Sequence, residues 1–204
     1  MPFDDFSKKD ESKFKYPPIK NTFNNGKRSP CTLNNFFPAR KSIRKTKKAV
    51  LEERRNSLEK AVLSKKEDGL KVKFFEGKGR GVVSTKPFQR GDFVVEYAGD
   101  LVEIDEAKQR EAFYSHFENV GCYMYYFQHK NKRYCVDATQ ETDRLGRLIN
   151  HSKNGNLITR TIEINGLPHL ILIANEDIAP DTELCYDYGD RSKMSLQYHP
   201  WLAL

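Results

Sequence analysis

Apolar and polar positions follow three different patterns along the chain. Residues 1–48 show no period, because Lys, Asn, Ser and Pro alternate with scattered Phe. A segment of this composition buries too little apolar surface to offset the loss of chain entropy on folding. We therefore expect residues 1–48 to form a disordered tail.

Residues 49–68 carry a helical pattern. A single stripe holds the apolar side chains of this segment, with Glu and Lys around them: Leu51, Leu58, Ala61 and Val62. Gly69 follows at a position that favours the end of a helix. The pattern predicts a flanking helix with a thin apolar face that packs at one edge of the body.

From residue 69 onward the period is that of β-strands. Leu70, Val72 and Phe74 alternate with lysines. Strands are predicted at 70–74, 82–83, 93–97, 123–128, 133–137, 157–164 and 169–174, and one helix at 105–117. The first hairpin turns through residues 129–132, and the second through Asn165-Gly166, a strong hairpin signal. Many short strands without a strand–helix–strand repeat indicate a β-rich α+β body in residues 69–204.

The net charge of +7 is unevenly distributed along the 204 residues. Residues 1–48 hold 13 Lys and Arg against 4 Asp and Glu, so they carry +9 and residues 49–204 carry −2. A basic tail favours an anionic partner, and a mildly acidic body favours basic peptides. The densest basic run, residues 40–48, is typical of nuclear-import or chromatin-binding segments, although a solvated linker has the same composition.

The cysteine pattern gives no sign of a metal site. The four cysteines lack a C-x-x-C pair and a histidine at zinc spacing: Cys31, Cys122, Cys135 and Cys185. We expect reduced, packed thiols, as in an intracellular protein. No apolar run approaches the roughly 18 residues of a membrane span, and the N-terminus lacks the core of a signal peptide.

One short stretch of the tail carries an aliphatic residue followed by an aromatic pair. Leu33 precedes Phe36 and Phe37, a spacing that resembles the box by which proteins dock on the replication sliding clamp. Pro30 stands where such boxes usually carry Gln. Scattered aromatic residues in an unstructured tail are the alternative, and the sequence leaves both open.

The residues that indicate chemistry gather in two segments. Residues 147–156 read RLINHSKNGN and place Asn150 beside His151, and residues 183–189 read ELCYDYG. Tyr186 and Tyr188 are two positions apart and share one face of an extended segment. Two phenols and an Asn-His turn suit a pocket that orients a group already reactive by itself. Either segment alone would also fit an Asn-rich turn or a Tyr-rich strand packed on a core.

These segments resemble the Arg-x-x-Asn-His-Ser and Glu-Leu-x-Tyr-Asp-Tyr-Gly motifs of the SET-domain lysine methyltransferases. Together with the glycine loop GKGRG at residues 77–81, their joint presence is specific. The resemblance covers residues 69–204 and implies the compact, β-rich SET fold, in which the C-terminal segment threads a preceding loop as a pseudoknot. GKGRGV, RGDFVVEY, GCYMYYF and PHLILIA are most similar to the histone H4 lysine-20 monomethyltransferases.

The resemblance also implies a role for individual residues. Contacts to S-adenosyl-L-methionine are expected from Lys78, Gly79, Arg80, Tyr123, Asn150, His151 and Trp201. Tyr188 would be the catalytic phenol, and Tyr97 and Tyr186 would hold the amine and a water. Glu111, Cys122 and Asp190 are the expected substrate contacts.

The function implied by this resemblance is transfer of one methyl group to a histone lysine. The substrate would be histone H4 lysine-20 on nucleosomes, and the protein would act in the nucleus on chromatin, its basic tail binding DNA or an acidic histone surface. A SET enzyme for a non-histone lysine is one alternative, and a non-catalytic chromatin-binding protein is another. Intact Asn150, His151 and Tyr188 argue against the latter.

Overall fold

The computed structural model describes residues 44–117, 121 and 123–189. The elements described below belong to the unit Lys45–Leu204. The clamp-like box at Leu33, Phe36 and Phe37 lies outside the described residues.

Helix α1 spans Lys47–Leu63, so it begins and ends before the predicted bounds. Thr46 caps its start by accepting a hydrogen bond from the backbone N of Ala49 at 3.2 Å. At its end Lys65 adopts a left-handed backbone conformation (φ 51°), and the N–H of Lys66 bonds back to the carbonyl of Ala61. This pattern closes a helix without glycine. Gly69, the predicted stop, therefore lies in the connection to the first strand.

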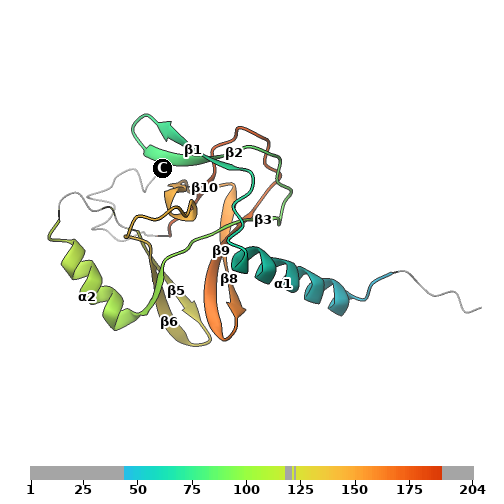
Figure 1. Cartoon of the computed structure of the whole chain (residues 1–204), viewed down its shortest axis with the longest axis horizontal. Helices are drawn as coiled ribbons and strands as arrows, with labels where there is room; N and C mark the ends of the chain where they lie inside the picture. The colour runs from blue at the N-terminus through green and yellow to red at the C-terminus, as the bar shows by residue number, and fades with distance from the viewer. Residues whose placement is uncertain (1–43, 118–120, 122, 190–204) are drawn as a thin grey trace, which may run out of the picture. The chain divides into compact units, whose positions relative to one another are not determined.

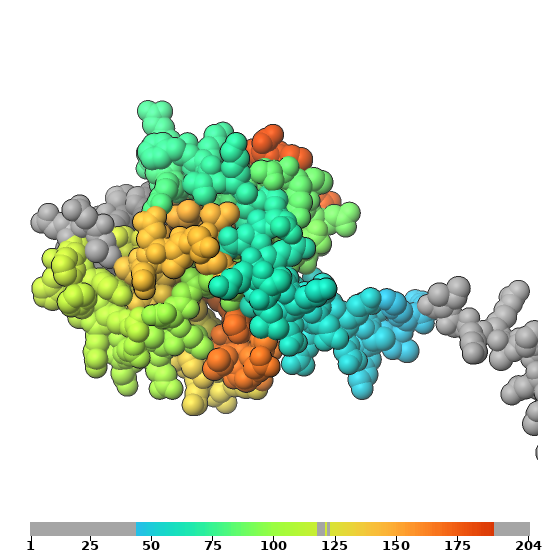
Figure 2. Space-filling model, in the orientation of Figure 1, coloured from blue at the N-terminus to red at the C-terminus, as the bar shows by residue number. Residues whose placement is uncertain are grey.

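The last turns of α1 pack their apolar side chains against the body, and Arg54 adds a hydrogen bond to the carbonyl of Gly91 at 3.0 Å. Residues 47–57 are all exposed, and Figure 2 shows the start of the helix projecting from the body. Val62 is buried against Ile171 and Ile173, and Leu58 packs at the margin of the same cluster. The thin apolar face thus packs against the body at the C-terminal end of α1.

Short strands make up most of the body (Figure 1). After α1 the elements are β1 (Leu70–Phe75), β2 (Gly79–Ser84), β3 (Phe93–Glu96), β4 (Asp100–Glu103), α2 (Ile104–Tyr114), β5 (Met124–His129), β6 (Lys132–Asp137), the 3₁₀ turn η2 (Gly146–Leu148), β7 (Asn150–His151), β8 (Leu157–Ile164), β9 (Leu167–Ala174) and β10 (Cys185–Tyr186). They form three sheets, with orders β1-β2, β4-β6-β5 and β3-β9-β8-β10-β7.

The two predicted hairpins are present, and one is tighter than expected. Asn165 and Gly166, both with positive φ (51° and 82°), join β8 to β9. Lys130 and Asn131, also with positive φ (46° and 64°), join β5 to β6 in two residues instead of the predicted four. Positive φ at both turn positions matches the right-handed twist of the strands. Strand β4 and the two-residue strands β7 and β10 were not predicted, and α2 ends at Tyr114 instead of residue 117.

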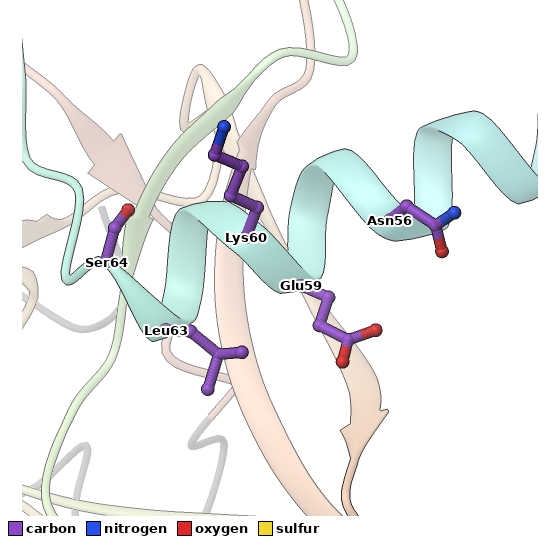
Figure 3. A pocket seen from close by; sticks show the side chains of 5 residues that line it. All are labelled: Asn56, Glu59, Lys60, Leu63 and Ser64. Carbon is purple, nitrogen blue, oxygen red and sulfur yellow. The ribbon is translucent and has the colours of Figure 1, made fainter.

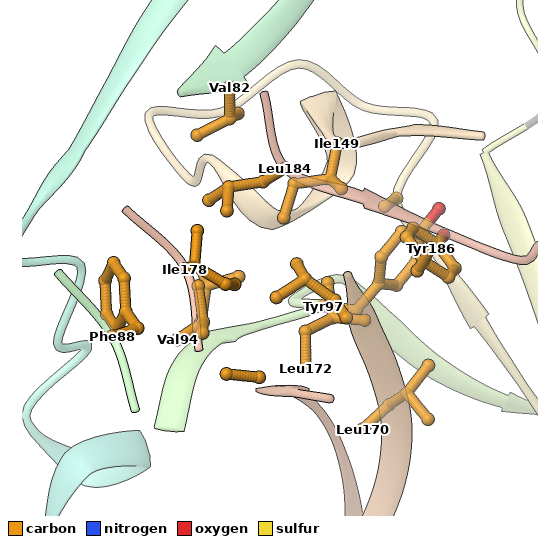
Figure 4. Packing of buried hydrophobic residues seen from close by; sticks show 14 of the residues in the cluster. Val82, Phe88, Val94, Tyr97, Ile149, Leu170, Leu172, Ile178, Leu184 and Tyr186 are labelled. Atoms are coloured by element: carbon orange, nitrogen blue, oxygen red, sulfur yellow. The ribbon is translucent and has the colours of Figure 1, made fainter. Parts of the chain in front are cut away.

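The main hydrophobic core is built from side chains of several strands and of the segments that join them. Its fully buried members include Val82, Val94, Ile149, Leu172 and Leu184 (Figure 4). Val82 comes from β2 and Leu184 from the residue before β10, joined by a hydrogen bond from the N–H of Leu184 to the carbonyl of Val82 at 2.8 Å. Packing of the core therefore places the C-terminal strand beside the glycine loop.

Strand β10 lies between β7 and β8, two strands that follow each other in the chain. The connection 152–156 between them must cross β10. Asn156 holds this crossing, because its amide donates to the carbonyl of Glu183 (2.8 Å) and accepts from the N–H of Cys185 (3.0 Å). A Cβ on Gly155 would stand 2.5 Å from the carbonyl oxygen of Cys185, so only glycine fits there. This is the crossing on which the predicted pseudoknot depends.

Candidate active site

Four tyrosine rings meet where β3, β5 and β10 come together. Tyr97 and Tyr186 are nearly buried, at 5% and 3% exposure, and Figure 4 shows them side by side at one end of the core. Their ring centroids are 6.5 Å apart, and Tyr125 lies 5.8 Å from Tyr97 and 6.2 Å from Tyr186. Tyr188 is 4.8 Å from Tyr186. Three residues far apart in sequence from one another, Tyr97, Tyr125 and Tyr186, thus form one aromatic wall.

Tyr188 links this wall to Asn150 and His151, which were expected in a turn and which form the two-residue strand β7. We keep the name Asn-His turn for these two residues. Its hydroxyl donates to the carbonyl of Ile149 at 2.7 Å, and its backbone N–H donates to Nδ1 of His151 at 3.1 Å. Because Nδ1 accepts, a neutral His151 carries its proton on Nε2. The parallel pairing of β7 with β10 sets Asn150 opposite Cys185 and His151 opposite Tyr186. The two segments singled out in the sequence therefore form one structural unit.

Tyr123 packs against Arg147 of η2, the 3₁₀ turn that precedes Asn150. The guanidinium of Arg147 stands 3.8 Å from the centre of the Tyr123 ring, and its Nε donates to the carbonyl of Ala138 at 2.7 Å. The carbonyl of Tyr123 accepts from the hydroxyl of Tyr97 at 3.0 Å. Arg147 is buried, so stacking and hydrogen bonds satisfy a charge that would otherwise destabilise the fold.

The glycine loop reaches the turn through a carboxylate that the sequence analysis did not single out. Glu183 accepts from Nζ of Lys78 at 3.1 Å and from the amide of Asn150 at 3.0 Å. Its position at the start of the ELCYDYG segment was the available signal. A Cβ on Gly81 would stand 2.5 Å from the Asn150 amide nitrogen, whereas Gly79 (φ 77°) faces open space. The tight packing at Gly81 and the open space at Gly79 suit a loop whose backbone closely approaches a ligand.

Other predicted residues lie farther from this unit. The side chain of Arg80 pairs with Glu141 at the surface, which raises the pKa of Arg80. Glu111 accepts from the hydroxyl of Tyr126 at 2.8 Å, and Tyr126 points to the opposite face of β5 from Tyr125. Cys122, Asp190 and Trp201 lie outside the described residues.

Cys185 is the cysteine within this unit, and it is not a nucleophile. Burial, together with the charge of Glu183, raises the pKa of its thiol to about 11. At neutral pH the group therefore stays protonated, and a thiol is a poor nucleophile in that form. Cys135, the other cysteine in the described part of the chain, is also buried.

Two depressions lie elsewhere on the described part of the chain, and one of them is lined by Arg55, Glu59, His129, Lys130, Ile162, Glu163 and Ile164. The other follows the last turns of α1 (Figure 3), lined by Asn56, Glu59, Lys60, Leu63 and Ser64. We assign no function to it, because one helix supplies its whole lining. Among residues 44–117, 121 and 123–189 no three His, Cys, Asp or Glu are placed to hold a metal ion. No helix in these ranges is long and apolar enough to cross a membrane.

The strand order, the β10 crossing and the joined Asn-His and Tyr-x-Tyr segments define a SET domain. The sequence profile of that domain matches residues 79–189, and the chain belongs to the SET-domain family. The expected fold is therefore confirmed.

Within the SET-domain family, the chain is similar to several named lysine methyltransferases. The chain is 57% identical over 187 residues to the histone-lysine N-methyltransferase Set8 of Drosophila melanogaster, covering 92% of this chain and 27% of the fly protein. It is 55% identical to the N-lysine methyltransferase KMT5A of Xenopus tropicalis (86% of this chain, 53% of the relative). Identity to the histone-lysine N-methyltransferase set-1 of Caenorhabditis elegans is 46% (84% and 72%). The chain thus spans about a quarter of the fly protein and about half of the frog protein.

A solved structure gives the same result in three dimensions. The crystal structure of CpSET8 from Cryptosporidium superposes with a TM-score of 0.63 at 39% identity, covering 69% of this chain and 67% of that chain. The similarity in sequence to the Set8 and KMT5A group therefore extends to the fold.

Proposed function

We propose that the chain is a protein-lysine methyltransferase that transfers one methyl group from S-adenosyl-L-methionine to a histone lysine. The observation that carries this proposal is the joining of the Asn150-His151 turn to Tyr188 by the hydrogen bonds at 2.7 and 3.1 Å. The names of relatives at 46–57% identity support the substrate class. The similarity to the histone H4 lysine-20 group makes that lysine on nucleosomes the proposed target.

The residues around the turn fit the cofactor that SET methyltransferases use. The open side of Gly79, the Asn150 amide and the Arg147-backed face of Tyr123 offer backbone, amide and aromatic contacts. Lys78, Arg80, His151 and Trp201 are further proposed contacts. S-adenosyl-L-methionine supplies a methyl group on a positively charged sulfur, which is already activated for transfer. The protein then has to align a neutral amine with that methyl group.

Supplying the neutral amine is the harder task. A free lysine with a pKa near 10.4 is only about 0.04% neutral at pH 7. A dry, aromatic channel disfavours the ammonium form, and a cation nearby disfavours it further, so the amine loses its proton to solvent more readily. The nearly buried rings of Tyr97 and Tyr186 provide such a wall. Alignment in a narrow channel contributes several kcal/mol more, by the usual scale of proximity effects.

The partners follow from the same proposal. The basic run at residues 40–48 would bind DNA or an acidic histone surface, and the protein would act in the nucleus on chromatin. The box at Leu33, Phe36 and Phe37 would bind a sliding clamp. Glu111 and Asp190 would contact the basic residues around the target lysine, and Cys122 would be a further substrate contact.

The test is incubation with labelled S-adenosyl-L-methionine and recombinant nucleosomes, followed by mass mapping of the modified lysine. Tyr188→Phe is the matched variant, because it removes one hydroxyl from the proposed catalytic group. We expect label on one histone lysine, and a far larger fall in turnover than in cofactor affinity for the variant. Absence of label from every histone would contradict the proposed substrate and would favour either the non-histone or the non-catalytic alternative.

A further inference from the structure

We infer that Glu67 is a positioning residue for the Asn150-His151 turn, although it lies outside residues 79–189 that match the SET profile. Glu67 belongs to the connection between α1 and β1. The inference rests on the proposed function, because that function makes the turn part of the cofactor site. It extends the working unit of the enzyme to the segment that precedes the family domain.

The carboxylate of Glu67, which is far from η2 in the sequence, caps the start of this 3₁₀ turn. The backbone N–H of Leu145, the residue before η2, donates to Oε2 of Glu67 at 3.2 Å. Nε of Arg144 donates to Oε1 at 2.8 Å. The first N–H groups of a helical turn have no partner within the turn, and a carboxylate there is favoured by charge as well as by hydrogen bonding. No side chain within the segment itself caps η2.

Arg144 connects Glu67 to strand β3 through a second ion pair. Its NH2 group donates to Oε2 of Glu96 at 3.0 Å, and Oε1 of Glu96 lies 2.8 Å from Nδ1 of His169 in β9. The side chains of Glu67, Arg144 and Glu96 are 16%, 13% and 12% exposed. Burial alone would lower the pKa of Arg144, but the hydrogen bonds to the two glutamates raise it, so the guanidinium stays charged.

The backbone on both sides of this network belongs to the candidate site. Glu96 immediately precedes Tyr97, and a Cβ on Gly146 would stand 2.2 Å from the carbonyl oxygen of Glu96. Residues 145–149 pass without interruption into Asn150. Gly146 of η2 therefore packs against the end of β3, and Glu67 binds the residue that precedes η2. Loss of the Glu67 carboxylate would remove the support of Leu145 and leave the hydrophobic core in place.

Glu67→Gln tests this arrangement, because it keeps the size of the side chain and removes its charge. Asp68→Asn is the matched control: it removes the same charge one position along the chain, from an exposed residue. We expect Glu67→Gln to weaken binding of S-adenosyl-L-methionine about tenfold, the scale of one hydrogen bond to a charged group. Turnover at saturating cofactor should stay within about twofold, because the hydrogen bonds of Glu67 go to Arg144 and to the backbone of Leu145. Asp68→Asn should change neither quantity.

Amide hydrogen exchange provides a readout that needs no cofactor. In Glu67→Gln, exchange should accelerate at residues 144–151 but not in the β8–β9 hairpin. Equal cofactor affinity and unchanged exchange would overturn the inference. A lower melting temperature with faster exchange throughout the body would overturn it too, since Glu67 would then be only structural. If the unmutated protein failed to bind S-adenosyl-L-methionine, the proposed function would fall, while exchange would still decide whether Glu67 holds the turn.

Discussion

Tyr186 is the side chain on which the number of transferred methyl groups depends in the proposed mechanism. Its ring is nearly buried and contacts three other tyrosines. A phenol at the amine end of the channel can hydrogen-bond a water that also holds the amine. A monomethylated lysine must displace this water to present its lone pair again, and loss of a well-bonded water is unfavourable.

We therefore expect the unmutated enzyme to make monomethyl-lysine and Tyr186→Phe to accumulate dimethyl-lysine. Each 1.36 kcal/mol removed from the barrier speeds the second transfer about tenfold. The first transfer should change little, and Tyr125→Phe serves as a control in the same aromatic wall. Mass spectrometry of the product over a long time course is the measurement. Substantial dimethylation by the unmutated enzyme would contradict the water account, as would none by Tyr186→Phe.

Among the elements, α2 packs on its sheet through the buried Ala107, and a buried carboxylate of the sheet bonds to it as well. Oδ2 of Asp137 in β6 accepts from NH1 of Arg110 at 3.0 Å and from the hydroxyl of Tyr114 at 2.9 Å. Its Oδ1 accepts from the N–H of Thr139 at 3.0 Å. Burial by itself would raise the pKa of Asp137, but the hydrogen bonds from Thr139, Arg110 and Tyr114 outweigh it, and the pKa lies below its ordinary value.

Asp137→Asn should destabilise the fold by roughly 2–4 kcal/mol at pH 7, because its amide nitrogen would face donors. The pKa is lowered by folding, so the contribution of the charged form is present above about pH 4 and is lost as the pH falls through the folded-state value. The difference between variant and unmutated protein should therefore shrink in acid. Urea unfolding at a series of pH values measures it.

Asp100→Asn is the control for this prediction. Asp100 binds the same Arg110 at 3.0 Å, but its side chain is 69% exposed. An exposed ion pair contributes about 0–1 kcal/mol, so this change should be small. Equal losses in both variants, or a loss at Asp137 that is independent of pH, would show that the buried carboxylate does not hold α2.

At the scale of the whole molecule, charge is separated along the chain. Residues 1–48 carry +9 and residues 49–204 carry −2. The proposal gives the run at 40–48 an anionic partner on the nucleosome, whereas a short histone peptide offers none. Exposed charges are screened over about 8 Å at physiological ionic strength, so this contribution should weaken with salt.

Neutralising Arg40, Lys41, Arg44 and Lys45 should lower activity on nucleosomes at low salt without lowering activity on a short histone peptide. The control neutralises four exposed lysines of the body, Lys65, Lys66, Lys71 and Lys73. Steady-state rates on both substrates, measured across a salt series, decide the matter. Equal losses on peptide and nucleosome would exclude a role for the run in binding the nucleosome.

Local patterns in the sequence were sufficient for much of the secondary structure and for the family. The β8–β9 hairpin follows from alternating residues around Asn165-Gly166, because turn chemistry there needs only neighbouring residues. The β5–β6 hairpin was also predicted, but its two-residue turn at Lys130-Asn131 was not, since positive φ at a lysine carries little sequence signal. The early end of α1 has the same cause, because a lysine takes the left-handed position there.

The tertiary structure alone decided how the site is assembled. Strands β7 and β10 have two residues each and form only because the core places them side by side. Glu183 reaches Asn150 across 33 positions, and Glu67 reaches Leu145 across 78. No local period records contacts at such separations, since they exist only after loops close and the core packs. The sequence by itself therefore determined which residues carry the chemistry, and the packing of the fold determined which side chains hold them in place.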